Sequence, residues 1–256
     1  MARVLITGSA DGLGLLAGRR LLDEGHDVVL HARNDKRADD TRAAARGVAA
    51  VLVGDLAGID ETRKVAEQAT AAGPFDAVIH NAAVGYRERR RVTTVDGLAQ
   101  VFAVNVLAPY LLTALVPAPA RLVYLSSGMH RMADPDLSDL QWERRRWNGS
   151  QAYAESKLFD TVLAFAVARR WPSVRANAVD PGWVPTRMGG RGAPDDLAQG
   201  TVTQAWLATS DDPAATGTGG YFYHQQQRGA HPAASDPAVQ DGLLAACAAL
   251  TGVEIG

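Results

Sequence analysis

The chain has 256 residues, which is long enough to bury a sizeable core in one α/β domain. Its formal net charge of −2 and pI near 6.3 give no bias toward nucleic acid, and arginine runs at 89–91 and 144–146 are short enough to be solvated loop faces. The single cysteine, Cys247, excludes an internal disulfide and suits a reducing compartment, and no signal peptide is recognisable, so we expect a cytoplasmic protein.

Short apolar runs alternate with helical patterns along the chain. The expected strands are RVLITG, DVVLHA, AAVLVGD, FDAVIHNA, RLVYLSS, RANAVDPG and GGYFY. Helices are expected near 13–24, 60–72, 97–115, 153–170 and 196–208. The alternation predicts a single α/β domain over residues 1–256, a doubly wound parallel sheet of about seven strands in a three-layer α/β/α arrangement. Ligands of such sheets bind outside the carboxyl ends of the strands, so strand ends are the first candidates for a site.

Residues 101–120 are apolar over the length of a membrane span. They also contain Asn105 and three prolines, and a strand-like run follows directly. We therefore expect a buried or subunit-interface helix here and no membrane association.

The first expected strand ends in a glycine-rich turn, TGSADGLG, before an amphipathic helix. Gly8, Gly12 and Gly14 follow TG-x-x-x-G-x-G, a relative of the dinucleotide-binding fingerprint. Glycines permit a tight turn and close approach of the backbone to a pyrophosphate, and the helix N-terminus offers N–H groups and a positive dipole end. The pattern favours a dinucleotide site over an ordinary strand-to-helix turn.

The tip of the second strand selects the cofactor ribose. An acid there binds the 2′-hydroxyl of NAD, whereas an arginine accommodates the 2′-phosphate of NADP. His31, Ala32 and Arg33 stand at the tip, and the first acid, Asp35, comes late. We expect NADP(H) to be preferred, with NAD(H) possible, and Arg33 to pair with the 2′-phosphate; an exposed loop charge is the alternative. The missing acid also weighs against a methyltransferase-like domain.

The stretch QAYAESKL brings a phenol and an ammonium together. On a helix, Tyr153 and Lys157 lie on one face, and a nearby cation favours the phenolate form of tyrosine. Lys157 is one of only three lysines in a chain whose other cationic residues are arginines. A lysine packed beside a half-buried tyrosine is the structural alternative.

These motifs resemble the short-chain dehydrogenase/reductase family, whose single-domain members have a Rossmann fold. Further family landmarks follow in order as GDL, HNAA, FAVNVLAPYLLT, VYLSSG and DPGWVPT, with Ala83 in place of the usual glycine. By this resemblance the catalytic residues are Asn105, Ser127, Tyr153 and Lys157. The residues expected to contact the cofactor are Gly8, Ser9, Gly12, Leu13, Gly14, Arg33, Asp55, Leu56, Asn81, Ala82, Tyr153, Lys157, Pro181, Gly182, Val184 and Thr186, and no metal is expected.

The resemblance is strongest to the retinol-dehydrogenase-like and WW-domain-oxidoreductase-like branch. Tyr153 follows Ser127 by 26 positions, where most family members have about half that spacing, and SSxxH and AYxxSKL also match the branch. The inserted residues 128–150 are expected to lie over the active-site mouth as part of the substrate wall, or to be an arginine-rich loop facing water. Because the first expected strand begins at residue 3, we expect no membrane anchor of the kind found in many retinoid enzymes, and a retinoid substrate is not carried over.

The resemblance implies an NADP(H)-dependent oxidoreductase that interconverts a ketone or aldehyde and an alcohol. Tyr153 would exchange the proton, and its pKa, ordinarily about 10, would have to fall for it to act near neutral pH. Lys157 would lower that pKa and bind the nicotinamide ribose, Ser127 would hydrogen-bond the substrate oxygen, and Asn105 would hold a water. Ser127 could instead only end a strand, and Asn105 could satisfy a kinked backbone.

Several alternatives remain open at this level. They are a non-catalytic NADP-binding regulatory protein, an NAD-dependent alcohol dehydrogenase working in the oxidative direction, and an extended nucleotide-sugar epimerase, whose glycine motif and longer C-terminal domain do not match. The expected partners are a small carbonyl or alcohol substrate and further copies of the chain, as a homodimer or homotetramer formed through the helices at 97–115 and 153–170. Nucleic acid is not expected.

Overall fold

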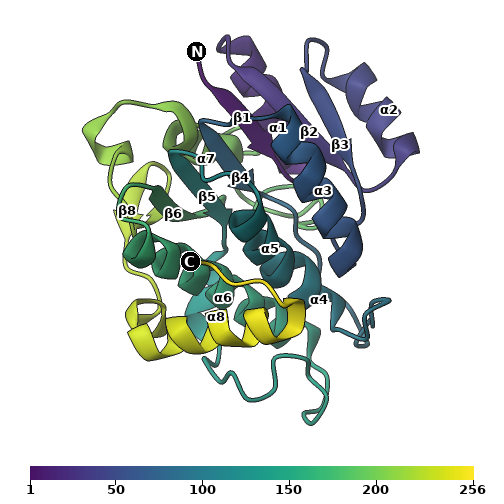
Figure 1. Ribbon diagram of the computed structural model, residues 1–256, viewed down its shortest axis with the longest axis vertical. Helices are drawn as coiled ribbons and strands as arrows, with labels where there is room; N and C mark the ends of the chain where they lie inside the picture. The colour runs from purple at the N-terminus through teal and green to yellow at the C-terminus, as the bar shows by residue number, and fades with distance from the viewer.

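The computed structural model describes residues 1–256, and its centre is one eight-stranded sheet in the order β3-β2-β1-β4-β5-β6-β7-β8 (Figure 1). All neighbouring strands are parallel except β8, which runs antiparallel to β7. The strands are β1 (Arg3–Ile6), β2 (Asp27–Ala32), β3 (Ala50–Val53), β4 (Ala77–His80), β5 (Arg121–Leu125), β6 (Arg175–Asp180), β7 (Tyr221–Tyr223) and β8 (Gln226–Arg228). The seven expected strands are all present, and the expected doubly wound α/β fold is confirmed.

The unexpected eighth strand forms a hairpin with β7. Its residues are all exposed, so no apolar alternation marks them as a strand. The hairpin turn is made by His224 and Gln225, both with positive φ, where a glycine-containing pair is the usual signal.

Helices cover both faces of the sheet. They are α1 (Gly12–Asp23), α2 (Asp35–Ala44), α3 (Ile59–Ala72), α4 (Gln100–Phe102), α5 (Ala108–Leu115), α6 (Gly149–Arg170), α7 (Gln199–Thr209) and α8 (Pro237–Thr251). Alternate strand residues reach opposite faces, as a pleated strand requires. Val4 and Ile6 pack in the cluster that includes α1, α2 and α7, whereas Leu5 packs in the larger cluster that includes α3, α5, α6 and α8.

The single helix expected over 97–115 is divided in three. A π-helical segment (Ala103–Leu107) separates α4 from α5. Pro109 stands four residues after Asn105 and has no backbone N–H, so the Asn105 carbonyl lacks the donor that an α-helix would supply. The proline therefore explains why regular α-helical bonding cannot continue through Asn105. No helix of the chain combines the length and the hydropathy needed to cross a bilayer.

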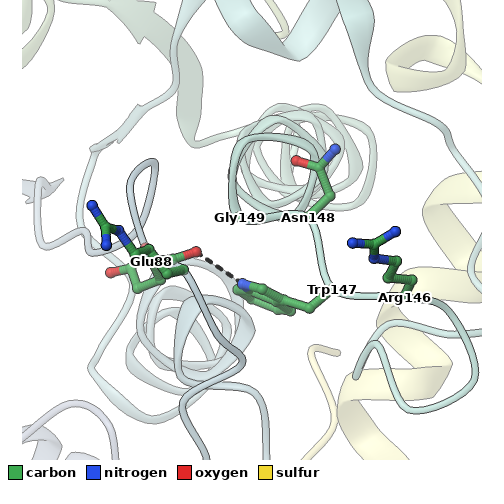
Figure 2. Close-up of a pocket in the computed structure, with 6 residues that line it drawn as sticks. Glu88, Arg146, Trp147, Asn148 and Gly149 are labelled. Carbon is green, nitrogen blue, oxygen red and sulfur yellow. Dashed lines mark hydrogen bonds between the residues drawn. The ribbon is translucent and has the colours of Figure 1, made fainter.

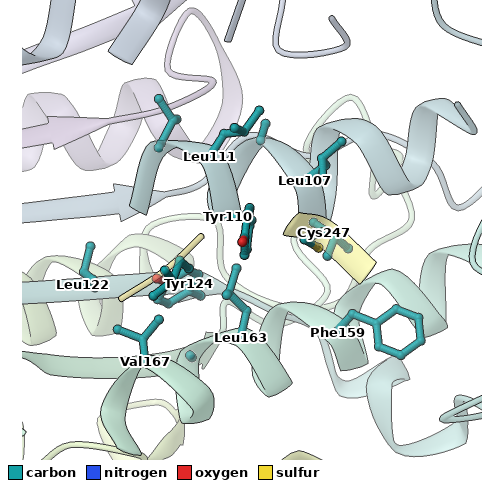
Figure 3. Packing of buried hydrophobic residues seen from close by; sticks show 14 of the residues in the cluster. Leu107, Tyr110, Leu111, Leu122, Tyr124, Phe159, Leu163, Val167 and Cys247 are labelled. Carbon is teal, nitrogen blue, oxygen red and sulfur yellow. The ribbon is translucent and has the colours of Figure 1, made fainter. Parts of the chain in front are cut away.

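Helix α6 runs through the interior of the chain. Every residue from 152 to 164 is buried. Figure 3 shows part of this packing: Leu163 and Val167 of α6 lie toward residues of α5 and β5, and Cys247 of α8 belongs to the same apolar cluster. Arg169 and Arg170 also form ion pairs with Asp241 of α8, so the C-terminal helix is fastened along α6.

Candidate active site

The strand order reverses beside β1, because β2 and β3 lie on one side of it and β4 lies on the other. In open α/β sheets this switch point is where ligands bind, outside the carboxyl ends of the strands. Thr7 and Gly8 follow β1 and Asn81 follows β4, so the glycine-rich turn and the HNAA segment meet at this place.

The glycines of the turn fit a bound pyrophosphate. Gly8 has a φ of +59°, and a Cβ on it would lie 2.6 Å from the Cα of Ala82. A Cβ on Gly14 would lie 2.4 Å from the Asn81 side chain. Gly12 has a φ of +55° but faces open space, with only Thr186 within 4 Å of a built Cβ. Asp11 makes no side-chain cap on α1, which leaves the first N–H groups of the helix available to an anion.

Side chains brace this turn from both sides. The Thr7 hydroxyl accepts the backbone N–H groups of Asn81 and Ala82, and the Asn81 amide donates to the carbonyls of Thr7 and Gly8. On the other side, Nδ1 of His31 accepts the Gly8 N–H at 3.0 Å, and its Nε2 donates to the Gly54 carbonyl at 2.9 Å. Burial lowers the pKa of His31, so the ring is a neutral brace.

Ser9 differs from its expected role. It has no exposed surface, and its hydroxyl accepts the His31 N–H and donates to the Ile6 carbonyl. Both hydrogen-bonding functions are used inside the protein, so we expect the side chain to shape the turn and not to contact a cofactor.

Two arginines lie near the expected position of the cofactor ribose. Arg33 is exposed and forms no ion pair or side-chain hydrogen bond. Arg37, one turn into α2, was not predicted; its Nη2 lies 2.6 Å from Oδ2 of Asp11 in the glycine-rich turn. Arg33 precedes the Asn34 cap of α2, so helical spacing does not relate the two arginines and no sequence signal identified Arg37.

The remaining expected cofactor residues lie in two other strand-end loops. After β3, Asp55 is exposed and accepts the Ala57 N–H, while the Leu56 side chain is buried in the core. After β6, the segment 181–186 faces the glycine-rich turn, since Thr186 lies near Gly12. The side chain of Leu13 and the carbonyl of Pro181 both lie against Gly200 of α7, and the Val184 side chain is buried there.

Tyr153, Lys157 and Ser127 are brought together at the end of β5. The Lys157 ammonium donates to the carbonyl of Leu125, the last residue of that strand, at 2.6 Å. The same Nζ lies 5.9 Å from the centroid of the Tyr153 ring. Ser127 is only partly buried, and its Oγ accepts the Met129 N–H at 3.3 Å, which leaves its hydroxyl proton available.

The acidity of Tyr153 is not that expected from sequence. Burial raises its pKa, Lys157 lowers it, Asp160 and Asp180 raise it further, and an interaction with Ser127 lowers it. Lys157 therefore acts in the expected direction but does not prevail, chiefly because the phenol is buried and also because two carboxylates lie close. In this structure the phenol is a protonated acid.

Asn105 has no exposed surface and lies in the π-helical segment. Its side chain accepts the Val84 N–H and donates to the Val84 carbonyl and to Ser156 Oγ. The amide thus satisfies backbone next to β4, which was the alternative expected for it. Its main-chain carbonyl, deprived of an α-helical donor by Pro109, is the group of Asn105 that could hold a water.

The inserted segment 128–150 is fastened to α6. The Glu155 side chain is buried, with 2% exposure. Its carboxylate accepts hydrogen bonds from both terminal nitrogens of Arg145 at 2.9 Å and from the indole N–H of Trp142 at 3.1 Å. The Arg145 guanidinium also lies 3.9 Å from the centroid of a Trp142 ring. Asp139 accepts the backbone N–H groups of residues 143–145, which closes the segment on itself.

The insertion places aromatic groups beside the phenol. Trp142 and Tyr153 belong to one buried apolar cluster, against which Tyr86, Met129, Trp147 and Met188 pack. The rings of Tyr86 and Tyr153 meet edge-on at 5.9 Å. Tyr86 has a φ of +81°, which is unusual for a bulky residue and indicates that its surroundings hold it there. Its position could not be read from the sequence, since no pattern marks residues 84–96.

A polar hollow lies at the start of α6, about one turn before Tyr153 (Figure 2). It is lined by Glu88, Arg89, Arg146, Trp147, Asn148 and Gly149. The indole N–H of Trp147 donates to the Glu88 carbonyl at 2.9 Å, which joins the 85–91 loop to the insertion. The hollow is outside the group formed by Ser127, Tyr153 and Lys157.

His130 was not predicted as part of the site, and it hydrogen-bonds to the backbone of Ser127. Its Nδ1 donates to the Ser127 carbonyl at 2.8 Å, and its Nε2 accepts the His231 N–H at 3.1 Å. Burial lowers the pKa of His130 to about 4, so the ring is neutral near pH 7. The match to SSxxH was the signal, but it did not disclose this bridging role.

Comparison with known proteins identifies similar chains over the full length. A family model described as short chain dehydrogenase matches residues 2–129. The chain is 42% identical to the short-chain dehydrogenase chyC of Penicillium rubens, covering 100% of this chain and 99% of that protein. It is 28% identical to human retinol dehydrogenase 13, covering 98% and 85% respectively. The structure of a blue fluorescent protein from a metagenomic library in complex with NADPH shares the fold, with a TM-score of 0.70 at 22% identity, over 86% of this chain and 95% of that chain.

Proposed function

The chain belongs to the short-chain dehydrogenase/reductase family, in its retinol-dehydrogenase-like branch, and we propose that it interconverts a ketone or aldehyde and an alcohol with NADP(H). The observation that carries the proposal is the convergence of Tyr153, Lys157 and Ser127 at the carboxyl end of β5, beside the glycine-rich turn. A nucleotide-binding sheet without catalysis would have no need to bury a phenol against an ammonium there.

The cofactor, when bound, supplies or accepts a hydride at the carbonyl carbon. In the reductive direction Tyr153 donates its phenolic proton to the substrate oxygen, and Ser127 donates a hydrogen bond that stabilises the negative charge developing on that oxygen. Lys157 stabilises the resulting phenolate. The Asn105 carbonyl holds a water that returns a proton to this group.

The residues proposed to hold the cofactor form one continuous track along the strand ends. The pyrophosphate binds at the first turn of α1 and the adjoining glycines, Gly8, Gly12 and Gly14. Asp55, Leu56, Asn81 and Ala82 line the adenosine and ribose side, and Pro181, Gly182, Val184 and Thr186 cover the nicotinamide. The fit is supported by the open face of Gly12 toward Thr186.

The preference for NADP(H) rests on Arg33. It carries no ion pair in the chain, so its guanidinium is available to a 2′-phosphate, whereas the nearby Arg37 is already paired with Asp11. His31, in place of an acid, leaves no carboxylate to receive a 2′-hydroxyl at this tip. An NAD-dependent dehydrogenase is therefore the weaker alternative.

The substrate wall favours an apolar, planar carbonyl compound. Tyr86, Met129, Trp147 and Met188 surround the cluster that contains Tyr153, and such side chains offer large apolar area with few hydrogen bonds. The polar hollow beside Trp147 suits a more hydrophilic end of the same molecule.

The expected homodimer or homotetramer is not favoured by the packing of α6. This helix is buried within the single chain, and α8 with the last residues of the chain occupies its outer side. Tyr110 of α5 donates to the Val253 carbonyl, so α5 is covered by the same segment. We infer that the chain acts as a monomer. The lone thiol, Cys247, is buried, and we retain a cytoplasmic location as a proposal.

The proposed function is tested by incubating the protein with NADPH and a panel of aromatic and aliphatic aldehydes and ketones. Loss of the reduced-cofactor absorbance is the readout. Tyr153→Phe should lower turnover by about 100-fold or more while leaving NADPH binding nearly intact. A Tyr153→Phe variant that retains most of its activity would refute the assignment. NADPH binding with no turnover of any carbonyl would favour the non-catalytic alternative.

A further inference from the structure

The catalytic ammonium has a buried partner of opposite charge. Nζ of Lys157 lies 2.8 Å from Oδ2 of Asp160, and the two side chains are 2% and 3% exposed. Both residues are on α6, three positions apart, so one rigid element carries the pair.

The pair limits how the ammonium can be oriented. A lysine has three N–H donors. One is used by the Leu125 carbonyl at 2.6 Å and a second by Asp160 at 2.8 Å. Only one donor remains, and the tetrahedral geometry of the nitrogen gives it a fixed direction once the other two are held.

The hydrogen bonds of Asp160 do not indicate a residue that serves only to stabilise the fold. Glu155, an equally buried acid on the same helix, accepts hydrogen bonds from Arg145, Trp142 and Gln151. Asp160 has one partner, and its Oδ1 is buried with none. A buried carboxylate with an unsatisfied oxygen loses more in desolvation than it recovers from a single ion pair. A contribution to stability therefore does not explain why a negatively charged residue is buried here.

We propose that Asp160 is a positioning residue that holds the Lys157 ammonium in one orientation and whose negative charge opposes the action of that ammonium on the Tyr153 phenol. This inference rests on the proposed function of Tyr153 and Lys157. It bears on both directions of the reaction, because a protonated phenol donates to a carbonyl oxygen, whereas oxidation of an alcohol needs the phenolate.

The charges around Tyr153 support this role. Burial is the main cause that raises the pKa of Tyr153, Lys157 lowers that pKa, and Asp160 and Asp180 of β6 each counteract part of the Lys157 effect. Burial raises the pKa of Asp160 itself to about 6 against the opposing effect of Lys157, so this carboxyl is ionised near pH 7.

The other titratable groups packed around the pair carry no charge near pH 7. Tyr124 of β5 is buried and its pKa is raised by burial. His80 of β4 stacks on Tyr124, and burial lowers its pKa to about 3. Tyr221 of β7 also has its pKa raised by burial. Lys157, Asp160 and Asp180 are thus the charges that modify the acidity of a phenol whose pKa is raised first by burial.

The decisive test needs no substrate. The protein is labelled with ¹³C at Cζ of its six tyrosines, and each phenol is titrated by NMR without cofactor, with Tyr153→Phe used to assign the signal. Asp160→Asn keeps the size of the side chain and an oxygen acceptor for Lys157 but removes the charge. We expect the Tyr153 titration to move down by about 1 pH unit. Glu155→Gln, which removes an equally buried charge from the same helix, should leave that titration in place.

An unchanged Tyr153 titration in Asp160→Asn overturns the inference. Should that variant not fold, Asp160→Ser gives the same comparison, since its smaller side chain leaves room for a water beside Lys157. With active enzyme, the rise of alcohol oxidation with pH should shift down by the same amount in Asp160→Asn, and reduction at neutral pH should slow. Failure of the proposed function would show itself differently, as activity retained in Tyr153→Phe.

Discussion

The inserted segment is attached to α6 through Glu155, so we expect substitutions of Glu155 to lower the free energy of unfolding. Replacing this residue by alanine leaves the Arg145 guanidinium and the buried Trp142 indole N–H without their acceptor. Breaking a fully buried ion pair from one side costs about 3–5 kcal/mol. The Arg145 side chain is 29% exposed and can recover water, which places the expected loss at the lower end, about 3 kcal/mol. Glu155→Gln keeps an acceptor for Trp142 and should lose about 1–2 kcal/mol.

Urea unfolding followed by far-ultraviolet circular dichroism measures this loss, and hydrogen exchange locates it. We expect faster exchange in residues 133–147 of Glu155→Ala, because the segment loses its attachment while the sheet remains. The KM for the carbonyl substrate should rise while the KM for NADPH stays near its original value.

Asp39→Ala is the matched control. It also removes the acid of an ion pair on a helix, but the Arg42 and Asp39 side chains are 52% and 78% exposed. Such exposed pairs contribute about 0–1 kcal/mol. If Glu155→Ala and Asp39→Ala lower the free energy of unfolding equally, the reasoning about the buried attachment is wrong.

Three further predictions concern the cofactor, pH and assembly. Arg33→Ala should raise the KM for NADPH about 10-fold or more while leaving that for NADH unchanged, as loss of a charge-assisted hydrogen bond implies, and equal effects on both would contradict the 2′-phosphate contact. Burial lowers the pKa of His130 to about 4 and that of His80 to about 3, whereas both rings take up a proton near pH 6.5 in the unfolded chain. The free energy of unfolding should therefore fall as the pH drops from 6.5 toward 4, by up to about 1.4 kcal/mol per pH unit for each ring. Urea titrations across this range that give a constant stability would exclude that contribution. Sedimentation velocity should show a species of 27.1 kDa, and deletion of residues 237–256 should cause self-association or aggregation; a stable dimer of the intact chain would refute the monomer.

The position of the glycine-rich turn between β1 and α1 was predictable because it depends on local pattern. The glycines at 8, 12 and 14 directly follow an apolar run, and their spacing predicts where the backbone turns. The same holds for Tyr153 and Lys157, which share a helical face by arithmetic alone.

Features that depend on long-range packing were not predictable. Ser9 was expected to contact the cofactor, but its hydroxyl accepts the backbone N–H of His31, which β2 brings next to it. The acidity of Tyr153 was misjudged mainly because the burial of its phenol depends on long-range packing, and also because Asp180 comes from the distant strand β6. Helix α2 is polar on nearly every side, with only Ala38 and Thr41 buried, so no periodic pattern marked it.

The bridge made by His130 has a consequence for how the enzyme matures during synthesis. One ring nitrogen holds the carbonyl of Ser127, and the other receives the backbone of His231, about a hundred residues later. A nascent chain can therefore form the glycine-rich turn early, yet the serine is not braced until the segment around His231 has been synthesised. We expect the Ser127 carbonyl to gain this support only late in synthesis.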